Sequence, residues 1–141
     1  MVKNRSIYYA LFILTLVAFP WINAKWGEFT LKMALEDKEI TLVGSHGSYQ
    51  LRVIDNQGNL TVRRGCYGII FDTLYLMQTH SEHLIENSDD RLNHALYDKQ
   101  RLLVYKIKQS GEGQHRLLHF PLEPQLPLID TPVVFTGKLG L

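Results

Sequence analysis

An apolar run without charge, Ile7–Phe19, constrains this chain more than any other feature of its sequence. Two basic residues precede the run, and Pro20 and the small residue Ala24 follow it. A basic start, an apolar middle and a helix breaker before a small residue are the parts of a secretory signal peptide in their usual order. The run is also shorter than the ~20 apolar residues that a permanent membrane-spanning helix needs. We therefore predict that residues 1–24 are a signal peptide, cleaved after Ala24.

The alternative is that this segment stays on the protein as a membrane anchor. Trp21 and Trp26 flank the predicted cleavage site, and tryptophan is common where a membrane helix meets water. In this interpretation residues 7–22 remain as a single-pass helix, with Lys3 and Arg5 on the inner side of the membrane. The protein is then periplasmic or secreted if the segment is cleaved, and anchored in the inner membrane if it is not.

The remainder, residues 25–141, is predicted to be a single exported domain, because its length suits one domain and not two. The whole chain carries 15 basic and 14 acidic residues, for a formal charge of +1. Lys3 and Arg5 are the only charged residues in 1–24, so without them the formal charge falls from +1 to −1. A nucleic-acid-binding domain needs a clustered basic excess. Nucleic acid is therefore not an expected partner.

Apolar and polar residues alternate through much of this domain, and a period of two predicts half-buried strands. Short polar loops predict hairpins between 49–53 and 60–63 and between 101–108 and 115–120. Residues 66–77, the most apolar part of the domain, are expected to form one central strand buried on both faces, with a bend at Gly68 or Asp72. The predicted fold is mainly β, a small β-sandwich or a partly open barrel with exposed edge strands. The full set of expected strands is 29–35, 40–43, 49–53, 60–63, 66–77, 101–108, 115–120 and 133–136.

One short helical insertion is expected around residues 79–99. Thr79 and Glu82 have the spacing of a capping box, which marks a helix start. Residues 87–90, Asn-Ser-Asp-Asp, place negative charge where a second helix would begin.

Three histidines in this insertion, His80, His83 and His94, are candidate ligands for zinc or copper. In a continuous helix His83 and His94 share a face, and His80 lies one turn from His83. Nearby carboxylates would complete such a site. Against it, residues 87–90 break the helix, and no H-E-x-x-H motif is present. A solvated charged face accounts for the same pattern.

Cys66 is the only cysteine, so the chain can form no internal disulfide. A small core residue explains it, and an intermolecular disulfide in an oxidising compartment or a nucleophilic thiol are the alternatives. Asn59 begins the sequence Asn-Leu-Thr, a glycosylation acceptor if the source is eukaryotic.

The segment 121–132 is rich in proline. Pro121, Pro124 and Pro127 recur every third residue, which suits a polyproline II helix with its rings along one edge. These prolines are candidate contacts for a protein partner. A stiff strap across the domain is the structural alternative.

No nucleophile elbow, phosphate loop or cysteine pair is present in the sequence. We therefore expect a non-enzymatic, exported cell-envelope protein, without a cofactor, that binds another envelope protein. An accessory or assembly component of a secretion, pilus or conjugation apparatus fits this description. The alternatives are a periplasmic metal-binding protein that uses the histidine cluster and a single-pass membrane-anchored envelope protein.

Overall fold

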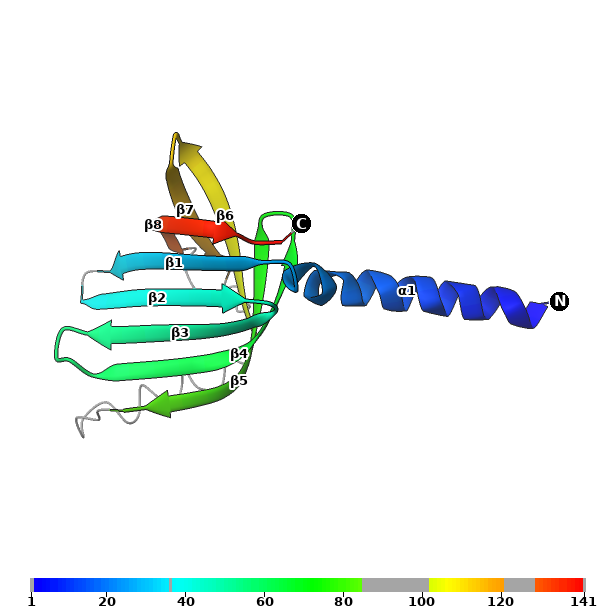
Figure 1. Cartoon of the computed structure of the whole chain (residues 1–141), viewed down its shortest axis with the longest axis horizontal. Helices are drawn as coiled ribbons and strands as arrows, with labels where there is room; N and C mark the ends of the chain where they lie inside the picture. Colours follow the sequence, from blue (N-terminus) through cyan, green and yellow to red (C-terminus); the bar gives the residue numbers. More distant parts are fainter. Residues whose placement is uncertain (1, 36, 85–101, 121–128, 141) are drawn as a thin grey trace.

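The computed structural model describes residues 2–35, 37–84, 102–120 and 129–140. One long helix leads into eight strands that close into a barrel (Figure 1). Each strand is antiparallel to the next, and β1 also pairs with β8, which completes the closure. The elements are α1 (Val2–Ala24), β1 (Glu28–Leu35), β2 (Lys38–Ser45), β3 (Ser48–Asp55), β4 (Leu60–Ile70), β5 (Thr73–His83), β6 (Leu102–Gly111), β7 (Gln114–Phe120) and β8 (Ile129–Lys138).

The predicted mainly β domain after an N-terminal helix is confirmed, as are both predicted hairpins, now β3–β4 and β6–β7. The described strands form a continuous ring. Pairing of β1 with β8 removes the outer edges that an open sheet would have. Strand β5, however, pairs with β6 only through Thr73–Met77, so within the described residues its stretch 78–83 has no partner strand on that side. An exposed edge along this part of β5 therefore stays a prediction.

The most apolar stretch, residues 66–77, is a hairpin and not the single central strand expected from its composition. Strand β4 ends at Ile70, Phe71 and Asp72 form the turn, and β5 begins at Thr73. Phe71 has a φ of 53°, a left-handed conformation that bulky residues rarely adopt. Asp72 is a residue type common in turns and was considered as a bend within the expected strand, but the single aspartate did not reveal that the chain reverses there.

The predicted helical insertion around 79–99 is wrong for residues 79–83, which the structure describes as strand. Strand β5 continues through Thr79 and Glu82 to His83, and pairing with β4 overrides the local capping-box spacing. Residues 85–101, which hold the rest of the predicted insertion, lie outside the described residues.

Helix α1 also differs from expectation, because Pro20 lies inside it and does not end it. The stretch Arg5–Ala24 has a mean hydropathy of 1.7 and is long and apolar enough to cross a membrane. The shortness of the charge-free run therefore does not distinguish a signal peptide from an anchor.

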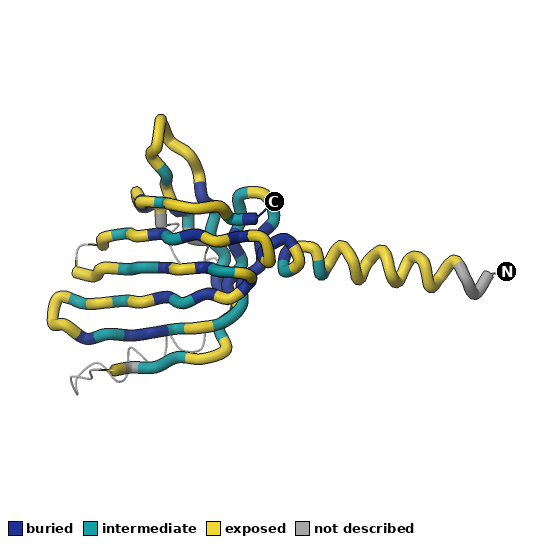
Figure 2. Tube along the Cα trace, viewed as in Figure 1, coloured by how far each residue is buried: buried dark blue, intermediate teal, exposed yellow. Residues whose placement is uncertain are grey.

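The core fills the barrel interior, and its largest fully buried side chains lie in the half next to α1. Figure 2 shows buried positions along the strands, whereas α1 is exposed along most of its length. Phe29 packs edge-on against Tyr67, with ring centroids 5.3 Å apart, and stacks with Phe135 at 6.1 Å. We call this half the helix end, and the opposite half, with the β1–β2 and β3–β4 turns, the far end (Figure 1). The fully buried side chains are Tyr67, Phe29, Leu31, Leu42, Ile69, Leu74 and Leu76.

Candidate functional sites

The last turn of α1 is built into the helix end of the barrel. Ala24 is fully buried and Asn23 is only 8% exposed. The Tyr67 hydroxyl lies 3.1 Å from the carbonyl oxygen of Ala24 and 3.0 Å from that of Gly27, and donates to them. The Asn23 side-chain amide donates to the carbonyl of Ile69 at 3.3 Å. These hydrogen bonds between buried polar groups join the helix to the barrel.

Close packing reinforces this junction at Gly68. A Cβ atom at this position would lie 3.0 Å from Pro20 Cβ and 3.3 Å from Trp21 Cδ2. The absence of a side chain on β4 therefore lets α1 rest directly on the strand. Residues on both sides of the predicted cleavage site thus belong to one packed unit.

A second feature is a group of polar side chains inside the barrel, on the wall formed by β4 and β5. Arg63 is paired with Leu51 on one side and with Ser81 on the other. Directly opposed residues share a face of the sheet, and Leu51 belongs to the core. Arg63 and Ser81 therefore face the interior. Gln78 faces it as well, because it is paired with Gly65, which opposes the core residue Tyr49. We call Arg63, Gln78 and Ser81 the polar cluster.

The polar cluster contains buried atoms that have no hydrogen-bond partner. They are Nε of Arg63, the side-chain carbonyl oxygen of Gln78 and the hydroxyl of Ser81. Within the described residues, no carboxylate forms an ion pair with Arg63. Buried polar groups are normally satisfied, and each unmade hydrogen bond costs about 1–3 kcal/mol.

A β-bulge explains why these residues face inward. The pairing of β4 with β5 shifts between Arg64 and Gly65, so that Thr79 is the extra residue. The Thr79 hydroxyl donates to the Arg64 carbonyl at 3.2 Å. A bulge reverses the inside–outside alternation beyond it, and here it directs Ser81 inward and His80 outward.

Two tyrosines border the polar cluster. Burial raises the pKa of Tyr49 to about 12, and the positive charge of Arg63 opposes part of this rise. Burial also raises the pKa of Tyr105 to about 12, again with Arg63 acting in the opposite direction. Both phenols therefore keep their protons at neutral pH, so neither one neutralises the guanidinium.

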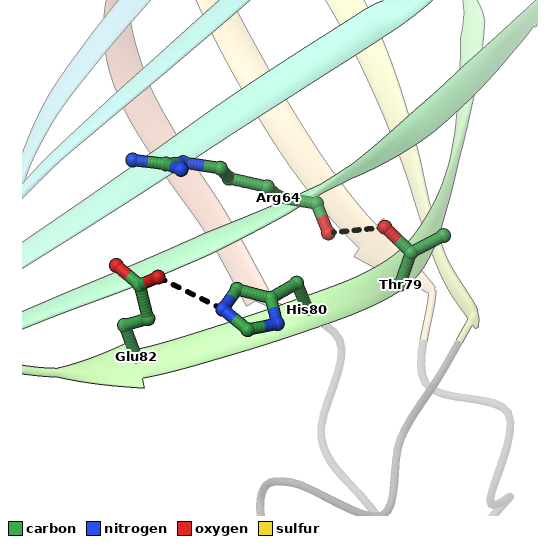
Figure 3. A network of polar contacts seen from close by, with 4 residues as sticks. All are labelled: Arg64, Thr79, His80 and Glu82. Atoms are coloured by element: carbon green, nitrogen blue, oxygen red, sulfur yellow. Dashed lines mark hydrogen bonds and ion pairs between the residues drawn. The ribbon is translucent and has the colours of Figure 1, made fainter.

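The outer wall of the same strands carries the first of the predicted metal ligands. His80 is exposed, and its Nε2 lies 2.9 Å from the Glu82 carboxylate (Figure 3). His80 and His83 belong to strand β5, so the helical alignment that motivated the metal site was wrong for these two residues. The side chain of His83 and the whole of His94 lie outside the described residues. Among the side chains that are described, no three of His, Cys, Asp or Glu could hold a metal ion, and the zinc or copper site stays a prediction.

Cys66 is a half-buried free thiol on β4. It is paired with Met77, which is 41% exposed, so both lie on the outer wall. The expected intermolecular disulfide stays a prediction. The predicted partner-binding prolines, Pro121, Pro124 and Pro127, lie outside the described residues.

Asn59, the possible glycosylation site, is only 9% exposed. Its side-chain amide donates to the Asp55 carboxylate at 2.8 Å. This hydrogen bond, together with backbone amides that also donate to Asp55, holds the pKa of that carboxyl below its usual value. A glycan on Asn59 would replace one of the two amide protons of a side chain that is only 9% exposed.

The polar cluster was missed by sequence reasoning. The alternation at 60–63 predicted a strand but did not show which of its sides faces the barrel interior. Val62 is 4% exposed and Thr61 is 9% exposed, so burial does not separate the two sides. Only the pairing with β3 places Thr61 and Arg63 inside the barrel. The available signal was the short loop of the β3–β4 hairpin, which sets the register and places Arg63 opposite Leu51.

Comparison of the chain with models of known protein families, and with characterised proteins, finds no match.

Proposed function

We propose that this protein is a membrane-anchored component of the cell envelope that retains α1 and acts, without catalysis, by binding another protein. The observation that carries the proposal is the junction between α1 and the barrel. Cleavage after Ala24 would remove the Asn23 hydrogen bond to Ile69 and the packing of Pro20 and Trp21 on Gly68. A leader that is discarded has no need of such contacts with the domain that it delivers.

The exposed surface of α1 supports an anchoring role. Apolar side chains from Ile7 to Phe19 are mostly more than half exposed, as in Phe12 at 64% and Leu14 at 64%. Water does not favour a continuous apolar helix surface, whereas a bilayer covers it. With Lys3 and Arg5 on the inner side, the barrel lies outside the cytoplasm.

Aromatic residues at the helix end fit contact with the membrane surface. Trp26 is 55% exposed just beyond α1, and Phe71 is 91% exposed at the tip of the β4–β5 turn. A hollow of about 330 Å³ lies between α1 and this turn, and Phe19, Phe71 and Lys138 are among its lining residues. Exposed aromatic rings beside a cation suit the boundary between acyl chains and headgroups.

Intact-mass measurement of the protein from fractionated cells tests the anchor. We expect the full 16.3 kDa chain in the membrane fraction, resistant to extraction with alkaline carbonate. A Phe71→Ser, Trp26→Ser double variant is expected to stay anchored by α1 but to lose protection of the barrel from added protease. Recovery of a soluble form that begins at Lys25 would refute the anchor.

The far end of the barrel, away from the membrane in this arrangement, offers a surface for the partner. A hollow of about 490 Å³ is formed there by β1, the β1–β2 turn and the β3–β4 turn. Leu35, Ile54 and Val134 line it and are 38%, 42% and 65% exposed. Charged side chains surround them: Lys32, Asp37, Lys38, Glu39 and Asp55. An apolar centre with a charged rim is typical of a protein-binding surface. An accessory or assembly role in a larger envelope apparatus fits such a surface.

Site-specific photo-crosslinking tests the partner surface. A crosslinking residue at Val134 is expected to give one discrete adduct with an envelope protein. The same residue at Val43, which is 41% exposed on β2 and does not line this hollow, is the matched control. Equal labelling at both positions, or labelling at neither, would contradict the proposed surface.

A further inference from the structure

The polar cluster inside the barrel has a capacity for hydrogen bonding that the described protein groups do not use. We propose that Arg63, Gln78 and Ser81 form a binding site for a small organic carboxylate that also carries a hydroxyl group. The site is separate from the partner surface and does not depend on it, because none of its three residues lines the hollow at the far end.

The unpartnered atoms define the chemistry of the ligand. Arg63 Nε is a buried donor without an acceptor, and a guanidinium pairs best with a planar carboxylate, which it can bind through two parallel hydrogen bonds. The side-chain carbonyl oxygen of Gln78 is a buried acceptor without a donor, and a ligand hydroxyl supplies one. The Ser81 hydroxyl can serve either group.

The arrangement of the strands brings these groups together. Arg63 and Ser81 are directly opposed across β4 and β5, where Cβ atoms lie about 4.5–5.5 Å apart. Gln78 is opposed to Gly65, in the next inward-facing row of the same two strands. Thus one bound molecule can reach all three side chains.

The surroundings favour an anion of limited size. Arg63 has no ion-pair partner among the described carboxylates, so a bound carboxylate would neutralise the charge of a partly buried guanidinium, where pairing is stronger than in water. The nearby Tyr49 and Tyr105 stay neutral at physiological pH, because burial raises the pKa of each to about 12. The ligand must also be small, because an eight-stranded barrel is either filled by its own side chains or holds one small ligand.

In this proposal the ligand enters from the far end. The helix end is filled by the foot of α1, where Ala24 and Tyr67 are fully buried. Arg63 lies near the start of β4, on the far-end side of the Tyr67 layer.

Calorimetric titration of the full chain in detergent micelles tests the site. The probes are sodium lactate, a hydroxycarboxylate, and sodium phosphate, with sodium chloride at equal ionic strength as the blank. We expect lactate to bind to the wild-type protein and to raise its melting temperature. Lactate affinity should fall at least ten-fold in Arg63→Gln. It should be unchanged in Arg64→Gln, which removes the same charge from an exposed neighbouring position on β4.

Three outcomes would overturn the proposal: no binding of lactate to the wild-type protein, equal binding to the two arginine variants, or binding of phosphate without binding of lactate. If Arg63→Gln does not fold, Ser81→Ala serves in its place, since it removes one hydroxyl and no charge. Lactate affinity should then fall several-fold relative to wild type, and unchanged affinity would refute the site.

Discussion

Buried polar groups have hydrogen-bond partners at the helix end of the barrel, whereas those of the polar cluster do not. At the helix end, the Tyr67 hydroxyl and the Asn23 amide both have carbonyl partners that join α1 to the sheet. In the far half, buried atoms of Arg63, Gln78 and Ser81 have none. Both halves belong to the same strands β4 and β5, so the difference is not one of fold. The helix end connects α1 to the barrel. In the polar cluster, the unmade hydrogen bonds lower the stability of the fold and leave groups that a ligand could bind.

The largest expected effect comes from high pH, through the two tyrosines that border the polar cluster. Tyr49 and Tyr105 have a pKa of about 12 in the folded chain, against about 10 for an unfolded tyrosine. A raised folded pKa means that the folded state holds its protons more tightly, so the stabilisation is complete below pH 10 and is lost as pH rises toward 12. We expect a loss on the order of a few kcal/mol across that interval.

Thermal melting from pH 7 to pH 11.5 measures this loss. Tyr49→Phe and Tyr105→Phe should each flatten the alkaline decline, because phenylalanine has no proton to lose. Tyr75→Phe, on the outer wall of β5, is the control and should leave the decline unchanged. If the two interior variants decline as steeply as wild type, another group controls alkaline unfolding.

The next largest effect tests the bulge that directs the polar cluster inward. A Cβ atom on Gly65 would collide with the Met77 carbonyl oxygen and lie 2.9 Å from Cε1 of Tyr49. Gly65→Ala therefore forces strand β4 away from β5. We expect a loss of about 2–3 kcal/mol in the free energy of unfolding.

Urea unfolding of Gly65→Ala and Gly111→Ala makes the comparison. The nearest atom to a Cβ on Gly111 is Gln114 Oε1 at 3.8 Å, so this control should change stability by less than 1 kcal/mol. Similar losses in the two variants would mean that the bulge is not a tight contact, and the sharp distinction between the two halves of the barrel would weaken.

Local signals in the sequence were sufficient for the two hairpins but not for the closed barrel. The loops of β3–β4 and β6–β7 are short and lie between alternating segments, so each hairpin could be recognised within about 20 residues of sequence. Closure requires β1 to pair with β8, for example Leu31 with Phe135. Nothing near Leu31 in the sequence indicates such a distant partner.

The polar cluster could not be predicted from the sequence, because it depends on a turn, a bulge and a strand register that the order of apolar and polar residues does not reveal. The turn at Phe71 and Asp72 has no glycine, and Asp72 alone suggested a bend in one strand and not a reversal of the chain. The bulge at Thr79 reverses the alternation in β5, and no residue type marks it. The inward position of Arg63 follows only once the register with Leu51 is known. Charged residues are usually expected to face water, so the pattern gave no reason to place Arg63, whose Nε atom is buried, inside the barrel.

The smallest expected effect tests the junction at the helix end and, with it, the retention of α1. Tyr67→Phe removes the hydroxyl that donates to Ala24 and Gly27 and leaves buried carbonyl oxygens without this donor. We expect the full chain to lose about 1–2 kcal/mol on unfolding.

The same substitution in a chain that begins at Lys25 tests whether α1 stabilises the barrel, as expected of a retained anchor and not of a cleaved signal peptide. Without the Ala24 carbonyl, the hydroxyl has one acceptor fewer, so the loss from Tyr67→Phe should be smaller than in the full chain. Chemical unfolding of the four proteins, in one detergent, gives the coupling between residue 67 and the helix as a double-mutant cycle. A coupling near zero would mean that α1 contributes nothing to the barrel through Tyr67. The helix end would then differ from the far half only in being apolar, and the argument for a retained anchor would lose its main support.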